Sequence, residues 1–170
     1  MHTDFVELRG SPLLKSPLRV EGEYRRPSDD TLVRAVRAPY IETTTIRGGE
    51  AIIERGGKAR RFSLSRAPEL QGLQASFGAM LSGDRAQLER FYTLDAQGTR
   101  QAWTLQLVPR DKALAAKVRD IVLRGRGAEL RCIETRPMKG DLQRTLLAGA
   151  ARGARDVADA AALATLCRGE

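Results

Sequence analysis

Residues 18–24 read Leu-Arg-Val-Glu-Gly-Glu-Tyr, and this run decides the fold class. Leu18, Val20 and Tyr24 fall on one side of an extended chain, and charged residues fall on the other. Because successive side chains of a strand point to opposite faces, the run predicts a strand with one dry and one wet face. Residues 103–107, Trp-Thr-Leu-Gln-Leu, repeat the pattern with a heavier apolar face. We therefore expect half-buried strands of an antiparallel sheet.

Glycines recur between such alternating runs and predict tight hairpins, because glycine readily adopts positive φ. Strands joined by short turns pair with their sequence neighbours, and a long twisted sheet curls. The chain is therefore predicted to form a curved antiparallel meander. Strands are predicted near residues 4–9, 17–26, 31–37, 40–47, 50–56, 58–65, 90–96, 100–108, 119–125, 128–137 and 142–147.

A curved sheet needs something to cover its concave side, and the segment after the sixth strand suits this role. Pro68 favours the first turn of a helix, and Gly83 ends it. The apolar positions between them share one helical face. These positions are Leu70, Leu73, Phe77, Met80 and Leu81.

Three further helical segments are expected. Asp84 with Gln87 is typical of a helix cap, and another helical turn is predicted from Asp111, carrying Leu114 and Val118. The Ala-rich stretch 149–166 favours a helix with a small apolar face, which we expect to be loosely attached. Residues 1–147 are thus predicted to form the main domain, with 148–170 as a C-terminal segment.

Composition and charge exclude several classes of protein. The 170 residues fit one domain, 42% are hydrophobic and 29% are charged, which argues against disorder. The net charge of +8 favours acidic partners. Arginine far outnumbers lysine, but the arginines are spread along the chain, and aromatic residues, at 5%, are too few for a nucleic-acid stacking platform. We therefore expect no nucleic-acid binding.

No catalytic constellation stands out, because the one histidine, His2, lies near the N-terminus. The pair Asp29-Asp30 is more typical of a solvated turn than of acid–base chemistry. We expect no enzyme, no metal site and no cofactor. Cys132 and Cys167 are either two buried thiols or a single bridge that ties the C-terminal segment to the sheet.

The N-terminus shows no signal-peptide pattern, and no stretch approaches the length of a membrane span. Either the protein is cytosolic, or a leader is absent from this chain.

Several short motifs resemble the LolA family of periplasmic lipoprotein carriers. Gly22 in an early strand, the Arg26-Pro27 pair, and the following Leu32-Val33-Arg34 and Pro39 occur in the family's order. The further matching motifs are 48–53, 68–70, 81–84, 103–111 and 140–141. The resemblance covers residues 5–147 and is to a divergent branch, some members of which occur beside aryl-polyene pathways.

This resemblance implies a mainly β fold with α: an incomplete antiparallel β-barrel with helices forming a lid over a hydrophobic cavity. It implies a non-enzymatic periplasmic carrier of lipidated protein or of acyl or aryl lipid, with an inner-membrane exporter and an outer-membrane receptor as partners. We expect a monomer. The arginine of the Arg-Pro pair latches the lid in this family; Arg26 takes that place, with Arg25 as a second candidate.

The cavity residues expected from the resemblance and the apolar parity together are Leu18, Val20, Tyr24, Leu32, Leu73, Phe77, Trp103, Leu105 and Leu107. The alternative hypothesis is a basic interaction module that docks an acidic membrane partner and carries no ligand.

Overall fold

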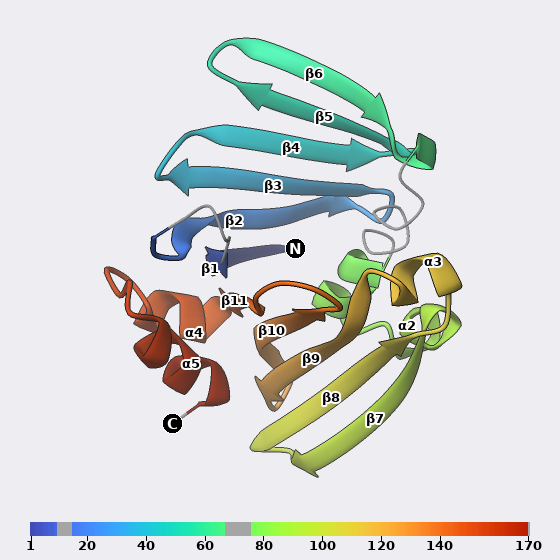
Figure 1. Ribbon diagram of the computed structural model, residues 1–170, viewed down its shortest axis with the longest axis vertical. Helices are drawn as coiled ribbons and strands as arrows, with labels where there is room; N and C mark the ends of the chain where they lie inside the picture. The colour runs from blue at the N-terminus through green and yellow to red at the C-terminus, as the bar shows by residue number, and fades with distance from the viewer. Residues whose placement is uncertain (10–14, 67–75, 170) are drawn as a thin grey trace.

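The computed structural model describes residues 1–9, 15–66 and 76–169. Within these ranges, eleven strands form one antiparallel sheet in the order β6-β5-β4-β3-β2-β1-β11-β10-β9-β8-β7 (Figure 1). The strands are β1 (His2–Arg9), β2 (Leu18–Ser28), β3 (Thr31–Ala38), β4 (Glu42–Arg47), β5 (Glu50–Arg55), β6 (Lys58–Ser63), β7 (Tyr92–Thr99), β8 (Ala102–Pro109), β9 (Val118–Arg126), β10 (Glu129–Pro137) and β11 (Gln143–Leu147). The predicted mainly β fold, an open and curved antiparallel sheet, is confirmed.

The first and last strands meet in the middle of the sheet, where Phe5 pairs with Leu147. The two edge strands, β6 and β7, are instead consecutive in the sequence and do not pair. The sheet therefore stays open between them. The connection from β6 to β7 carries the helical elements that lie on the concave side (Figure 1).

This connection contains a 3₁₀ turn, η1 (Leu64–Arg66), a helix over residues 76–82 and a short helix, α2 (Arg85–Phe91). The helix over 76–82 ends before Gly83, which adopts a φ of 72°, as predicted. Its expected earlier part, with Leu70 and Leu73, lies outside the described residues. Asp84 caps α2 by accepting from the Gln87 backbone N–H at 3.1 Å.

Two local expectations were wrong. The strand expected from residue 90 begins at Tyr92, because α2 continues through Phe91. Asp111 does cap a helix, α3 (Lys112–Ala115), but Val118 starts β9 and is not part of the helical turn.

The sheet bends where its register slips. One irregularity falls between Glu21 and Gly22, opposite β3. A Cβ added to Gly22 would lie 2.0 Å from the Ala35 carbonyl oxygen, so only glycine permits this close backbone approach. Such bulges increase the local twist and curl the sheet around its concave face.

The C-terminal segment forms α4 (Ala148–Gly153) and α5 (Ala160–Arg168), and the expectation of loose attachment was wrong. Both helices pack on the convex face, on the other side of the central strands from the helix over 76–82 (Figure 1). Cys132 and Cys167 form a disulfide. Arg19 donates to the carbonyls of Ala154 at 2.9 Å and Val157 at 2.6 Å, which ties the segment after α4 to β2. Part of the face expected to be wet is therefore a second core.

That second core contains Val6, Leu8, Leu146, Ala150, Ala151, Ala154 and Leu163.

The domain boundary at residue 147 stays a prediction.

Candidate functional site

Three hollows surround the helix over 76–82 on the concave face. Their volumes are about 410, 380 and 290 Å³. Met80 lines the two larger hollows and so stands between them. Leu32 and Ile46 line both the first and the third. We call them the central, distal and rim cavities, in that order.

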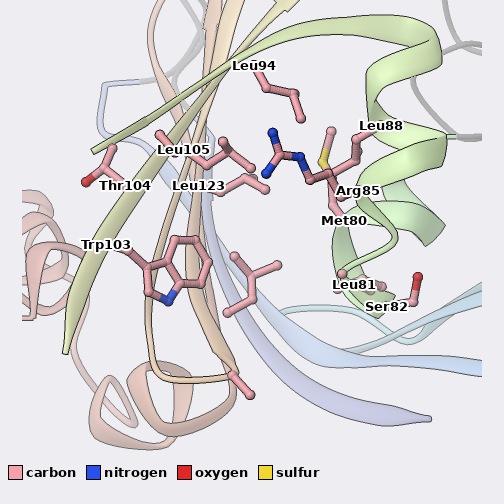
Figure 2. A pocket seen from close by; sticks show the side chains of 14 residues that line it. Met80, Leu81, Ser82, Arg85, Leu88, Leu94, Trp103, Thr104, Leu105 and Leu123 are labelled. Carbon is pink, nitrogen blue, oxygen red and sulfur yellow. The ribbon is translucent and has the colours of Figure 1, made fainter. Parts of the chain in front are cut away.

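The distal cavity, of about 380 Å³, lies between this helix, α2 and the β7–β9 end of the sheet (Figure 2). Its wall is apolar apart from a few polar groups, such as Thr104 and the largely exposed Arg85. Trp103 Nε1 donates to the Gly127 carbonyl at 2.9 Å, which fixes the indole. The indole occupies the space above Gly125, where an added Cβ would lie 2.0 Å from a ring carbon. The apolar lining residues are Met80, Leu81, Leu88, Leu94, Ala96, Trp103, Leu105, Leu123, Ala128 and Leu130.

The central cavity, of about 410 Å³, has two unlike halves. One half is apolar and is lined by Leu32, Ile46, Ile53, Phe77, Met80, Ile121 and Ile133. The other half is polar and is lined by Glu7, Arg9, Tyr24, Arg34, Thr44, Thr135, Gln143 and Thr145.

A stack of aromatic rings joins the helix to the sheet. The Tyr24 ring lies 4.8 Å from that of Phe77 and 4.7 Å from that of Phe5. Tyr24 is buried, and its burial raises the pKa of the phenol to about 12. Ser76 and Tyr92 add a buried contact of 2.6 Å between their hydroxyls. These contacts hold the described part of the helix against the sheet.

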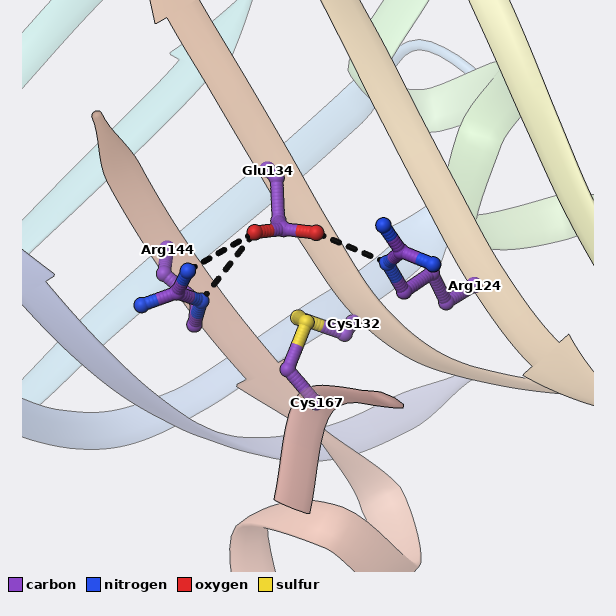
Figure 3. Close-up of a disulfide and its surroundings, with 5 residues drawn as sticks. All are labelled: Arg124, Cys132, Glu134, Arg144 and Cys167. Atoms are coloured by element: carbon purple, nitrogen blue, oxygen red, sulfur yellow. Dashed lines mark hydrogen bonds and ion pairs between the residues drawn. A yellow bond between two sulfur atoms is a disulfide. The ribbon is translucent and has the colours of Figure 1, made fainter. Parts of the chain in front are cut away.

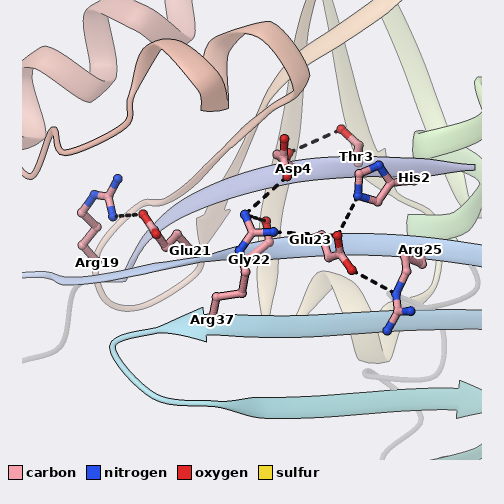
Figure 4. A network of polar contacts seen from close by, with 9 residues as sticks. All are labelled: His2, Thr3, Asp4, Arg19, Glu21, Gly22, Glu23, Arg25 and Arg37. Atoms are coloured by element: carbon pink, nitrogen blue, oxygen red, sulfur yellow. Dashed lines mark hydrogen bonds and ion pairs between the residues drawn. The ribbon is translucent and has the colours of Figure 1, made fainter.

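Arg26 and Arg25 lie on opposite faces of β2. Arg26 borders the rim cavity and donates to the Asp29 carbonyl at 3.1 Å. It also lies beside the helix, since a Cβ on Gly78 would be 3.6 Å from Arg26 Nε. Arg25 is exposed and pairs with Glu23 at 3.2 Å on the convex face (Figure 4). Of the two latch candidates, Arg26 is thus the one that contacts the helix.

Most of the predicted cavity residues gather on the concave face. Tyr24, Leu32 and Phe77 line the central cavity, and Trp103 and Leu105 line the distal cavity. Leu18, Val20 and Leu107 belong to the same apolar cluster beneath the helix but line none of the three hollows. Leu73 lies outside the described residues. Their role in holding a ligand stays a prediction.

Sequence reasoning missed Met80 as a cavity residue, and it missed the polar half of the central cavity. Glu7 and Arg34 are charged, so no apolar signal marks them as residues of the concave face. The signal that could have found them is side-chain alternation. Glu7 lies two residues after Phe5 on the same strand and so points to the same face, and Phe5 is buried on the concave side. Arg34 pairs with Tyr24 across the strands and therefore points to the same side.

On the convex face, buried carboxylates are paired with arginines. Glu134 accepts from Arg124 at 2.7 Å and from Arg144 at 2.9 Å, beside the disulfide (Figure 3). Burial raises the pKa of Glu134, but these hydrogen bonds outweigh it and hold the pKa below its ordinary value. Asp120 is similarly paired with Arg136 and Gln106. These contacts join neighbouring strands and are structural.

His2, Asp4 and Glu23 form a group of possible metal ligands near the N-terminus (Figure 4). Glu23 already contacts His2 at 2.7 Å and Arg25 at 3.2 Å, and the His2 side chain is more than half exposed. This arrangement is that of a surface ion-pair network.

The fold and the site define a class: an open antiparallel sheet whose apolar concave face is hollowed beneath a covering helix. The family model "Outer membrane lipoprotein carrier protein LolA-like" matches residues 1–170. The chain belongs to this LolA-like family.

Among solved structures, a LolA superfamily protein from Nitrosomonas europaea is similar at 11% identity and a TM-score of 0.41. The match covers 86% of this chain and 83% of that one. A search of curated proteins finds no match. Within the described ranges, no helix is long and apolar enough to cross a membrane.

Proposed function

We propose that this protein is a non-enzymatic, monomeric periplasmic carrier that shields an acyl or aryl chain, free or attached to a protein, on its way to the outer membrane. The observation that carries the proposal is the set of hollows beneath the helix over 76–82. Two of them, at about 380 and 410 Å³, fall in the size range of small-molecule sites. An inner-membrane exporter and an outer-membrane receptor would be its partners.

The cover of the concave face supports this function. The sheet is open between its edge strands β6 and β7. The described part of the helix contacts the sheet through side chains such as Phe77. Displacing Phe77 and Met80 would join the central and distal cavities along one apolar path. A ligand chain that enters this path contacts the cavity walls in place of Phe77 and Met80. The apolar surface that the ligand buries then offsets the surface that the displaced side chains expose.

Binding of an apolar dye, and its displacement by a fatty acid, tests the proposal directly. Leu105→Arg and Leu32→Arg each place a charge in a cavity wall and should abolish dye binding. Val108→Arg is the matched control for Leu105→Arg: Val108 is 42% exposed on the same strand, so dye binding should be unchanged. Circular dichroism checks that each variant folds. A folded wild-type protein that binds neither dye nor fatty acid would contradict the proposal.

The interaction-module alternative has one observation in its favour. Arg47, Arg55 and Arg61, on β4–β6, have side chains that are 59–72% exposed, and each is paired with a carboxylate, so exposed arginines lie near one edge of the sheet. This alternative predicts salt-sensitive capture of an acidic membrane protein by a chain that carries no lipid. Native mass spectrometry of gently extracted protein separates the two, because a carrier retains its lipid.

A further inference from the structure

The central cavity places charged groups on the face that should be dry. Glu7 is only 5% exposed, and its carboxylate sits on the concave side of β1 between Phe5 and Arg9. The Arg34 guanidinium lies 5.0 Å from the centre of the Phe5 ring, and its side chain is 13% exposed. Buried charges are costly unless they are paired. Glu7 and Arg34 therefore need a physical reason to lie on this mostly apolar face.

The carboxylate of Glu7 is well supplied with donors. Oε1 accepts from Arg9 Nε and lies 3.4 Å from Arg34 Nη2. Oε2 accepts from the Thr145 hydroxyl at 3.2 Å. Arg34 also donates to the Tyr24 phenol oxygen. The acceptor capacity of this cluster is thus largely used.

The donor capacity of the cluster is not used up. Arg34 Nε is buried and has no hydrogen-bond partner among the described residues. Arg9 lines the same cavity and is 45% exposed. Two guanidinium groups face one carboxylate, so the cluster carries a net charge of about +1 with N–H groups to spare. Such a site is complementary to an acceptor that bears negative charge.

The charged cluster adjoins an apolar path. Ile46 and Ile53 line the same cavity, and Met80 lines both this cavity and the apolar distal one. An amphiphile would place its head at Arg34 and its chain past Met80.

We propose that the central cavity binds the anionic head group, carboxylate or phosphate, of a single-chain amphiphile, with Arg34 and Arg9 as its ligands. This inference rests on the proposed carrier function and names the chemical class of the ligand. Glu7 sets the charge of the site by neutralising one of the two arginines, and it holds both guanidinium groups in place.

The test compares three probes with the same chain: oleate, oleyl phosphate and oleyl alcohol. Wild-type protein should bind at least one of the two anions about tenfold more tightly than the alcohol, because only the anions make charge-assisted hydrogen bonds. The tighter of the two anions identifies the head group. Equal binding of all three would overturn the inference and leave the carrier function standing. Binding of none would overturn both.

Variants of the cluster give effects of opposite sign. Arg34→Gln removes the net charge and should weaken binding of the preferred anion about tenfold, with binding of the alcohol unchanged. Glu7→Gln raises the net charge to about +2 and should tighten binding of the anion. Arg37→Gln, on the convex face of the same strand, is the matched control and should change neither. A purely structural role for the cluster would instead weaken all probes alike in both Arg34→Gln and Glu7→Gln. That result would overturn the inference.

Discussion

The two faces of the sheet are both covered by helices, but they are covered in opposite ways. On the convex face, Ala150, Ala151 and Ala154 bring α4 close to the strands, and a disulfide fixes α5. On the concave face, the helix over 76–82 contacts the sheet through Phe77, whose ring lies against that of Tyr24, and its Met80 borders two hollows. The hollows beside the C-terminal helices are about 60 and 80 Å³, whereas those beneath the concave helix reach about 410 Å³.

The two faces thus differ in how completely their covers fill the space above the strands. Small residues give close packing, which stabilises the fold. On the concave face, the side chains around Met80 leave volume that their neighbours do not fill. We expect the convex cover to contribute to stability and the concave cover to ligand binding, and four predictions test this division.

The largest expected effect is the loss of the disulfide. Replacing Cys132 and Cys167 together with Ser opens a link across 35 residues and should lower the free energy of unfolding by about 4 kcal/mol, since the unfolded chain regains loop entropy. Urea unfolding measures this. Dye affinity in the folded protein should stay unchanged. A weakened affinity would show that the two faces are coupled.

Removing one large side chain from each cover should give unequal losses. Leu163→Ala, at a fully buried position of α5, should cost about 3 kcal/mol, because it creates a cavity in a filled core. Met80→Ala should cost less, about 2 kcal/mol, because Met80 borders two hollows and has fewer contacts to lose on those sides. The same change joins the central and distal cavities and should tighten binding of long chains. Equal losses of stability for Leu163→Ala and Met80→Ala, measured by thermal unfolding, would contradict this difference between the two covers.

The ion pairs of the convex face should make the free energy of unfolding depend on pH. The pKa of Glu134 is lowered in the folded protein, so its stabilising effect is fully present above its ordinary pKa of about 4.5. It is lost as the pH falls through the lower folded value. Glu134→Gln should cost about 2 kcal/mol at pH 7 and reduce the pH dependence below pH 4.5. An unchanged acid-unfolding profile would argue against this role.

The smallest effect on stability is expected at the rim. Arg26→Ala should change the free energy of unfolding by less than about 1 kcal/mol, yet it should speed the release of a bound dye several-fold, because it removes a contact beside Gly78. Arg25→Ala is the control, since that side chain lies on the opposite face. Stopped-flow fluorescence compares the two. Equal release rates for wild type and Arg26→Ala would remove Arg26 as the latch.

The fold was largely predictable, because the signals that set it are local. Period-two alternation in residues 18–24 and 103–107, together with glycine turns, located strands that agree closely with those observed. The caps at Asp84 and Asp111 were equally local. The site was predicted only in part: Tyr24, Leu32 and Leu105 carry apolar signals, whereas nothing apolar marks Glu7 or Arg34.

The sequence by itself determined which residues form strands and which side of each strand is mostly apolar. Only the tertiary structure decided that β1 pairs with β11, that β6 and β7 stay apart, and that Cys132 meets Cys167. It also decided that Glu7 and Arg34 share the dry face. Alternation is a property of neighbouring residues, but burying a charge requires a partner from elsewhere in the chain, and Glu7 finds Arg34 27 residues away. Such pairings follow from register and closure, which no local pattern specifies.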